Sequence, residues 1–243
     1  MRVLVVTAVT AERDAVTAAS GPPPGEVRLP GGTLLHRVKP GNADGPVLDV
    51  LAAGVGPAAS AAGAATALTA AALTGEPYQL VIASGIAGGF APRAGLGAVV
   101  VSDAIVAPDL GAQSSDGGFL SLSELGFGVI EHRVPEPLAR RVAEATGAVR
   151  GEVLTVTSAT GTAERAAELT ARHPDAVAEG MEGFGVAEAA VAHQVPVIEL
   201  RTVSNAVGPR DRGTWRVGEA LAALTGAYRR LHPVLTGDPE VSP

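Results

Sequence analysis

Cysteine is absent from the 243-residue chain, and lysine occurs only once, as Lys39. Without cysteine the protein has no disulfide, no thiolate metal site and no cysteine nucleophile, which fits the cytoplasm. The net charge is −7 and no basic run is present, which argues against a nucleic-acid partner. No segment reaches the roughly 18 apolar residues of a membrane-spanning helix, so we expect no membrane partner. We also expect no metal and no cofactor.

The composition is that of one folded domain. Of the residues, 47% are hydrophobic, which is enough to bury one sizeable core. The first residues, "MRVLVVTAVTAERD" (1–14), mimic a short signal peptide. The charged residues that follow the apolar run at once favour a first strand leading into a helix. We predict a single domain over residues 1–232 and a disordered tail over 233–243.

Short β-rich runs alternate with helical stretches. Strands are expected at 3–6, 47–53, 79–83, 98–101, 152–156, 176–178 and 195–203. Helices are expected at 11–19, 58–73, 137–145, 162–173, 182–193 and 215–231. Runs such as "VPVIELRTV" (195–203) are apolar with little alternation, which is typical of strands buried on both faces. The pattern predicts the α/β class, as a single three-layer α/β/α domain with a central mixed, largely parallel, twisted sheet.

Two stretches interrupt this alternation. Residues 20–46 are rich in glycine and proline and are expected to form a loop or an edge hairpin. Residues 107–136 include "PDLGAQSSDGGFLSLSELGFG" (108–128). A loop of this length in a compact domain is usually functional or disordered.

Two glycine-rich motifs follow predicted strands, where open α/β sheets bind their ligands. They are "LAAGVGPAAS" (51–60) and "ASGIAGGFAP" (83–92), and the second contains Ala87 and Gly88. Glycine permits close approach of the backbone to a ligand, and we interpret the second motif as a loop that contacts phosphate or ribose. A tight turn after a strand explains the glycines equally well.

Four polar residues also stand at predicted strand ends or in a strand. Glu12 is either a first-turn helical residue or a general base. Glu182 is favoured electrostatically near a helix N-terminus, and its carboxylate is also suited to accept two hydrogen bonds from a vicinal diol such as ribose. Arg201 lies in an apolar strand and needs a carboxylate partner or a ligand. Asn205, in "RTVSNAVGPRDR" (201–212), is either a turn residue or an amide that reads a ligand.

Together these motifs resemble a known family. The segments "TAVTAE" (7–12), "AGVGPAASA" (53–61), "ASGIAGGFAP", "GMEGFGVAEAA" (180–190) and "RTVSNAVGPRDR" occur in the order of the nucleoside phosphorylase/nucleoside hydrolase superfamily. The chain looks most like its branch of methylthioadenosine/S-adenosylhomocysteine nucleosidases. The resemblance extends from Met1 to about Leu231 and implies cleavage of the N-glycosidic bond of a purine nucleoside.

The resemblance implies a role for each matching residue. Glu12 matches the general base that activates water, and Glu182 the carboxylate that binds the ribose 2′- and 3′-hydroxyls. Met181 matches the residue packed on the sugar face, and Arg201 the arginine that holds the water and the acidic residues. The segment "VTSATG" (156–161) matches the loop facing the purine, so we expect backbone groups near Thr160 to contact the base.

This chain departs from the family's pattern in three places. Ala159 and Thr160 stand where the family often stacks an aromatic ring on the base, and Ile86 stands where nucleosidases place a serine. Adenine-specific nucleosidases carry aspartate in place of Asn205. Hypoxanthine presents acceptors at N7 and O6, and an amide NH₂ group donates two hydrogen bonds. We therefore expect Asn205 to select a 6-oxopurine nucleoside, with Asp109 or Asp211 as weakly supported acids for the leaving base.

Three alternatives stay open: an adenine-specific nucleosidase, a 6-oxopurine nucleoside phosphorylase, and a purine-binding or storage relative without activity. Ser60 and the helix start near Pro57 offer an anion site, and Arg93 lies just downstream of the second glycine-rich motif. Water is favoured over phosphate as the nucleophile because Glu12 would repel phosphate. Glu12, Glu182 and Arg201 in one chain argue against the non-catalytic relative.

A substituent on the ribose 5′ carbon needs a pocket of its own. The long loop supplies Leu110, Phe119 and Phe127 as candidates for its apolar part. The candidates for a cation are Arg210, Arg212 and His132, each of which is by default a solvated surface residue. Family members commonly dimerise with this loop closing the partner's site, so the resemblance implies a homodimer or a higher homo-oligomer.

Overall fold

The apolar runs assemble into one sheet in the computed structural model, which describes residues 1–21, 23–39 and 45–235. The strands follow the order β11-β10-β6-β12-β5-β1-β4-β3-β2, and β9 pairs with β6. Their bounds are β1 (Arg2–Thr7), β2 (Gly25–Arg28), β3 (Leu34–Val38), β4 (Val47–Ala52), β5 (Leu80–Gly89), β6 (Val99–Val106), β9 (Glu131–Arg133), β10 (Val149–Thr155), β11 (Ala176–Gly180) and β12 (Val197–Ala206).

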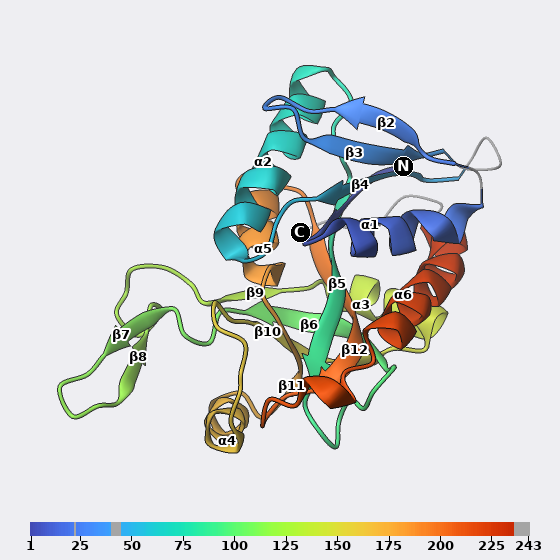
Figure 1. Cartoon of the computed structure of the whole chain (residues 1–243). Coiled ribbons are helices and arrows are strands. Elements are labelled where there is room, and N and C mark those ends of the chain that lie inside the picture. The colour runs from blue at the N-terminus through green and yellow to red at the C-terminus, as the bar shows by residue number, and fades with distance from the viewer. Residues whose placement is uncertain (22, 40–44, 236–243) are drawn as a thin grey trace.

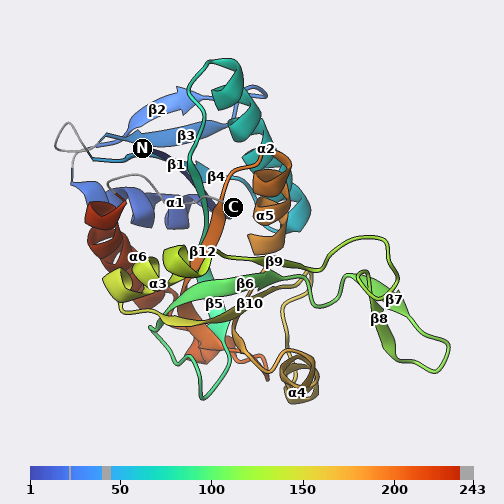
Figure 2. The ribbon, with the colours of Figure 1, turned by 180° about the vertical axis from the view of Figure 1, so that it is seen from behind.

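Helices cover both faces of this sheet (Figures 1 and 2). One side carries α2 (Pro57–Leu73) and α5 (Gly183–Ala192), and the other carries α1 (Thr10–Thr17), α3 (Glu136–Thr146) and α6 (Val217–Leu231). The helix α4 (Ala163–Arg172) lies apart from these two groups, below the sheet in Figure 1. Single-turn 3₁₀ helices occur at Ala18–Ser20, Arg212–Thr214 and His232–Val234. The predicted α/β/α layers and the mixed sheet are confirmed.

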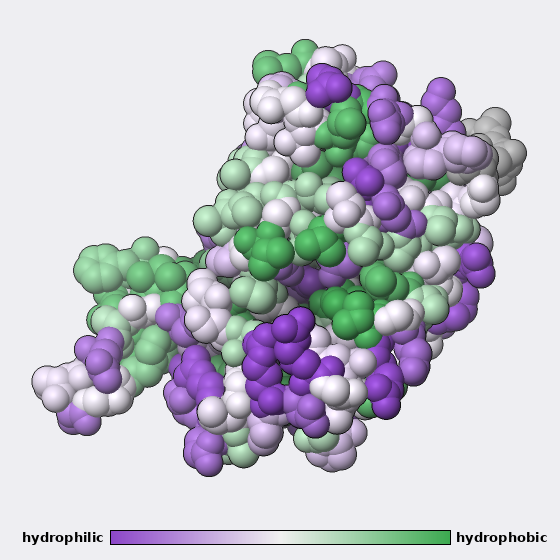
Figure 3. All heavy atoms as spheres, in the orientation of Figure 1, coloured by the Kyte–Doolittle hydropathy of each residue, from purple (hydrophilic) through white to green (hydrophobic). Residues whose placement is uncertain are grey.

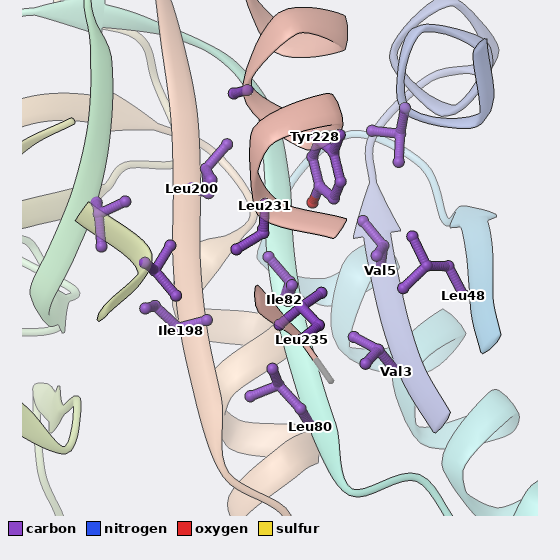
Figure 4. Close-up of a cluster of buried hydrophobic side chains, with 14 of the residues drawn as sticks. Val3, Val5, Leu48, Leu80, Ile82, Ile198, Leu200, Tyr228, Leu231 and Leu235 are labelled. Atoms are coloured by element: carbon purple, nitrogen blue, oxygen red, sulfur yellow. The ribbon is translucent and has the colours of Figure 1, made fainter. Parts of the chain in front are cut away.

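The layers follow from the two-residue period of the strands. In β1, Val3 and Val5 join a core cluster with Tyr228 of α6, which Figure 4 shows between the helix and the strands. Leu4 and Val6 point to the opposite face and join a second cluster with α2 and α5. Each fully buried side chain of this size contributes about 1.5–3 kcal/mol through the hydrophobic effect. The continuous apolar strands are therefore buried on both faces, as predicted.

One part of the sheet closes on itself. The end of β5 pairs with β12 on one side, where Gly88 is opposite Asn205, and with β11 on the other, where Gly88 is opposite Glu179. The strands β5, β12, β6, β10 and β11 therefore form a ring. The sequence motif 83–92 was expected to be a loop, and this expectation is wrong, because β5 continues through it to Gly89. Two neighbouring strands supply its hydrogen-bond partners there.

The two stretches that interrupt the alternation, residues 20–46 and 107–136, contain short strands. β2 and β3 form the expected edge hairpin, although residues 22 and 40–44 lie outside the described part. In the long stretch, β7 (Gly111–Gln113) and β8 (Phe119–Ser121) form a second hairpin that projects from the body in both views (Figures 1 and 2). Leu235, which was predicted to belong to a disordered tail, is buried in the core. The rest of the predicted tail from 236 to 243 lies outside the described residues.

Candidate active site

A cavity of about 400 Å³ opens where β1, β5, β11 and β12 end, a size suited to a small ligand. In the space-filling view the centre of this face is hollowed, with hydrophilic residues inside and hydrophobic ones on either side (Figure 3). Nine residues carry the predicted catalytic and nucleoside-binding roles, and all of them except Phe119 line this cavity or bind to its lining. Those that line it are Glu12, Ala87, Gly88, Thr160, Met181, Glu182 and Asn205, and Arg201 lies directly beneath.

Glu12 lies in the first turn of α1 and reaches into the cavity. Its Oε2 accepts hydrogen bonds from the backbone N–H groups of Ala8 and Val9, at 3.0 and 3.2 Å, and its Oε1 accepts one from Ile86, at 2.9 Å. A Cβ atom at Gly85 would lie 2.5 Å from Glu12 Oε1, so glycine is required there. Glu12 is therefore a residue of the first helical turn whose fixed carboxylate also lines the cavity, and its role as a general base stays a prediction.

Glu182 caps α5 and faces the start of α2. Its Oε1 accepts from the Gly56 N–H at 3.2 Å, and its Oε2 accepts from the Met181 N–H at 3.3 Å. Ser60, fully buried in α2, donates to the Glu182 carbonyl oxygen at 3.0 Å. At the N-terminus of α2, which the sequence offered as an anion site, the Gly56 N–H is therefore already used by the protein's own carboxylate.

Arg201 is 1% exposed and connects two carboxylates beneath the cavity. Its Nε donates to Glu199 Oε1 at 2.8 Å, its Nη1 lies 3.0 Å from Glu182 Oε2, and the same Nη1 donates to the Ile86 carbonyl oxygen at 3.3 Å. Burial lowers the pKa of Arg201, but the carboxylates of Glu199, Glu182 and Glu12 outweigh it and raise that pKa above its ordinary value. Arg201 is thus a permanent cation among acidic groups.

Glu199 is the carboxylate partner that the sequence required for Arg201 but did not name. It precedes Arg201 by two residues, which places both side chains on one face of β12. Burial raises the pKa of Glu199 to about 7, although Arg201 acts in the opposite direction. A Cβ atom at Gly183 would lie 2.0 Å from Glu199 Oε2, so the first residue of α5 has to be glycine. The sequence signal that could have identified Glu199 is its charge inside the apolar strand β12.

Asn205 lies near the end of β12 with its amide fixed by its own chain. Ser204 Oγ donates to Asn205 Oδ1 at 2.8 Å, and Asn205 Nδ2 donates to the Ala206 carbonyl oxygen at 3.0 Å. The amide is thereby fixed in orientation, and one of its two N–H groups remains for a ligand. The sequence assigned two N–H donors to the ligand, and the structure leaves one.

Thr160 faces the cavity, but its backbone N–H is already used. It donates to Glu179 Oε1 at 2.8 Å, and the Thr160 hydroxyl donates to Glu179 Oε2 at 2.5 Å. Glu179 is buried, lines the cavity and was not singled out in the sequence. This N–H is therefore not free for a ligand, and a carboxylate faces the cavity beside it, while contacts of other backbone groups near Thr160 with the base stay a prediction.

Phe119 and most of the other peripheral candidates lie outside the cavity lining. Phe119 is in β8, with the Arg172 guanidinium 4.7 Å from its ring centre. His132 pairs with Glu188 at 2.6 Å, and Arg93 lies 3.5 Å from Asp175. Phe119 does not line the cavity of its own chain, because the hairpin that carries it projects away, and its place over a partner's site stays a prediction. The other predicted candidates that do not line the cavity are Leu110, Phe127, Asp109 and Arg212.

Two peripheral candidates do line the cavity. Arg210 lies there with its guanidinium 5.4 Å from the ring centre of Trp215, a residue that the sequence did not single out. Asp211 also lines the cavity, and its carboxylate accepts from the Gly213 N–H at 3.0 Å, at the start of a 3₁₀ turn.

Neither a metal cluster nor a membrane span is found in the described residues. Across 1–21, 23–39 and 45–235, no three histidine, aspartate or glutamate side chains gather to hold a metal ion. No helix in the same part of the chain is long and apolar enough to cross a membrane.

The fold and this arrangement of residues are those of a nucleoside-cleaving family. Residues 3–236 match the family model of the phosphorylase superfamily, and the chain belongs to that superfamily. It is 61% identical to a futalosine hydrolase of Streptomyces coelicolor over 97% of each chain, and 43% identical to a futalosine hydrolase of Acidothermus cellulolyticus over 94% of this chain and 89% of the other.

A solved structure gives the same fold. It is a 5′-methylthioadenosine/S-adenosylhomocysteine nucleosidase of Colwellia psychrerythraea in complex with adenine, with a TM-score of 0.82 and 19% identity over 98% of this chain and 97% of that one. The predicted membership of this superfamily is confirmed by the family model, and the relatives at 61% and 43% identity relate the chain to futalosine hydrolases.

Proposed function

We propose that the protein is an N-glycosyl hydrolase that cleaves futalosine to hypoxanthine and dehypoxanthine futalosine, a step of the futalosine route to menaquinone. The observation that carries the proposal is the meeting of Glu12, Glu182 and Asn205 in one cavity. These residues come from three distant segments and provide a base for water, a diol acceptor and a donor for the purine. The relatedness to futalosine hydrolases at 61% identity supports the choice of substrate.

Cleavage of an N-glycosidic bond passes through a ribosyl centre with oxocarbenium character, as in glycoside hydrolysis. Glu12 takes a proton from the attacking water, and three backbone N–H groups hold its carboxylate in place for this step. Glu182 Oε1 accepts one hydrogen bond from the protein and keeps a lone pair for the ribose hydroxyls. Met181 packs on the sugar, and the strand segment of Ala87 and Gly88 supports the nucleoside from below.

Hydrolysis is favoured over phosphorolysis by the start of α2. The Glu182 carboxylate lies at this helix N-terminus and accepts from the Gly56 N–H, and the Ser60 hydroxyl donates to the Glu182 carbonyl, so a second anion there would meet a negative charge. A phosphate at this place would also meet the carboxylates of Glu12 and Glu182. Arg93, the cation just downstream of the second glycine-rich motif, pairs with Asp175 and does not line the cavity.

The direct test is an assay in phosphate-free buffer with futalosine beside methylthioadenosine. We expect release of hypoxanthine from futalosine, measured by chromatography, and much slower release of adenine. Release that depends strictly on phosphate indicates a phosphorylase, and a preference for methylthioadenosine indicates the adenine-specific nucleosidase. Binding of purines without turnover of either nucleoside indicates the non-catalytic relative, and each of these results contradicts the proposal.

Replacement of Asn205 by aspartate is expected to lower kcat/KM for futalosine about tenfold to a hundredfold, because an ionised carboxylate removes the donor and faces the O6 lone pairs. Adenine nucleosides are expected to gain slightly. The comparison of kcat/KM for both substrates checks this, with Ser204→Ala as a control that loosens the amide without changing its charge. An unchanged preference in the aspartate variant shows that Asn205 does not read the base.

We assign Arg210 to the carboxylate at the 5′ end of futalosine, because it is the one of the three cation candidates that lines the cavity. Trp215, which lies beneath its guanidinium, offers an aromatic face to the phenyl ring of the same group.

A homodimer is the assembly that we propose for this enzyme. The projecting hairpin and its surroundings expose apolar side chains, among them Phe127 at 80% and Val129 at 52%. Apolar residues gathered on a projecting segment mark an interaction surface. In such a dimer the hairpin with Phe119 covers the cavity of the partner subunit.

A further inference from the structure

We propose that Glu179 reads the N1–H group of the 6-oxopurine and, together with Asn205, determines which base the enzyme accepts. This inference rests on the proposed function and extends it from one base-reading residue to two. Glu179 accepts a hydrogen bond from the N1–H group of hypoxanthine, while the remaining Asn205 N–H donates to one acceptor on the neighbouring edge of the ring.

The sheet places the two residues on either side of one glycine. Glu179 of β11 and Asn205 of β12 both pair with Gly88 of β5. Directly paired residues on neighbouring strands carry their side chains on the same face of the sheet, and neighbouring strands lie about 4.8 Å apart. The backbones of Glu179 and Asn205 are therefore about 10 Å apart, with Gly88 between them.

Gly88 has no side chain to displace the Asn205 amide from this position. A Cβ atom at Gly88 would lie 3.3 Å from Asn205 Nδ2 and 2.8 Å from Val207 Cγ2, so only glycine leaves room for both of these side chains. Glu179, Gly88 and Asn205 all line the same cavity. A flat ring in this cavity between Glu179 and Asn205 meets an acceptor on one side and a donor on the other.

Thr160 holds the Glu179 carboxylate for this role. Each Glu179 oxygen accepts one hydrogen bond from Thr160, and each retains a second lone pair for a ligand. Burial raises the pKa of Glu179, and the two hydrogen bonds from Thr160 oppose this by stabilising the ionised form. The carboxylate is thus buried and fixed in direction while still able to accept.

The two purines differ at the atom that Glu179 faces. Hypoxanthine carries a donor at N1 and acceptors at O6 and N7, whereas adenine carries an acceptor at N1 and a donor amino group. A carboxylate opposite N1 forms a hydrogen bond with hypoxanthine and faces a lone pair of adenine. Polar mismatches of this kind discriminate strongly, because a buried polar group is left without a partner.

Binding of the free bases tests the inference without turnover. Wild-type protein is expected to bind hypoxanthine about tenfold to a hundredfold more tightly than 1-methylhypoxanthine, measured by calorimetry, because the methyl group replaces the N1 proton. In Glu179→Ala this difference is expected to fall to within about threefold. In Glu179→Gln, which keeps the size of the side chain, hypoxanthine is expected to weaken tenfold or more relative to adenine.

Glu168→Gln is the matched control, since Glu168 is a carboxylate that pairs with Arg165 on α4 and lies outside the cavity lining. It is expected to leave the hypoxanthine to 1-methylhypoxanthine ratio unchanged. Equal weakening of hypoxanthine and adenine in Glu179→Gln, or the same methyl penalty in wild type and Glu179→Ala, overturns the inference and leaves Glu179 as a support for the 156–161 segment.

Thermal melting identifies a variant that fails to fold. If Glu179→Ala does not fold, the test is decided by Glu179→Gln. Absence of hypoxanthine release from futalosine by the wild type rejects the proposed function alone, because the base-binding ratios are read independently of turnover. If the Glu179 variants keep the wild-type ratio of hypoxanthine to 1-methylhypoxanthine affinity and the wild type turns over futalosine, only the role of Glu179 is rejected.

Discussion

Replacement of Glu12 by glutamine is expected to lower kcat about 100- to 10,000-fold while the substrate still binds. The amide cannot take a proton from water, so the activation of the nucleophile is lost. Its oxygen can still accept from the Ala8 and Val9 N–H groups, but its NH₂ group then faces the Ile86 N–H, which loses its acceptor. Single-turnover rates and substrate affinity, measured separately, check this prediction.

Asp14→Asn is the matched control for this experiment. Asp14 lies two residues further along α1, its side chain is 56% exposed, and its carboxylate pairs with Arg13. This variant is expected to turn over at the wild-type rate. Wild-type turnover in the Glu12 variant removes Glu12 from the mechanism, and the loss of binding in place of turnover makes it a substrate-binding residue.

Replacement of Arg201 by methionine is expected to lower the free energy of unfolding by about 3–5 kcal/mol. The methionine fills much of the volume, but Glu199 and Glu182 lose the cation that lies 2.8 and 3.0 Å from them. Uncompensated carboxylates in a buried place are costly, because water no longer solvates them. Urea unfolding at neutral pH checks this prediction.

The double variant Arg201→Met/Glu199→Gln is expected to recover part of the lost stability. Burial already raises the pKa of Glu199 to about 7, so a neutral glutamine resembles its protonated form. Glu199→Gln alone is the control for the loss of this carboxylate. A methionine variant as stable as the wild type shows that Arg201 contributes nothing to the fold beyond its volume.

The sequence predicts the helices and most strands of this fold because their apolar residues follow a clear period. It fails at the end of β5, where glycines give no period to follow. Ser84 to Gly89 form a strand only because β12 and β11 pair with them, and these strands are distant in the chain. The place of Phe119 could not be predicted either, since nothing local states that its hairpin projects from the body.

The residues of the site were predictable to different degrees. Arg201 in an apolar strand required a buried partner, and the two-residue period of β12 points to Glu199. Glu12, Glu182 and Asn205 stand out because polar residues at strand ends face the ligand in this class of fold. Glu179 is one more charge at a strand end, and only its pairing across Gly88 with Asn205 distinguishes it.

The ring of strands has a consequence for substitutions in the site. Main-chain hydrogen bonds, such as those from the Phe90 N–H to the Val177 carbonyl and from the Val207 N–H to the Gly89 carbonyl, hold β11 and β12 to the end of β5. The side chains of Glu179 and Asn205 take no part in them. Substitution of these two residues therefore leaves the frame of the sheet in place, whereas Arg201 and Glu199 have to change together.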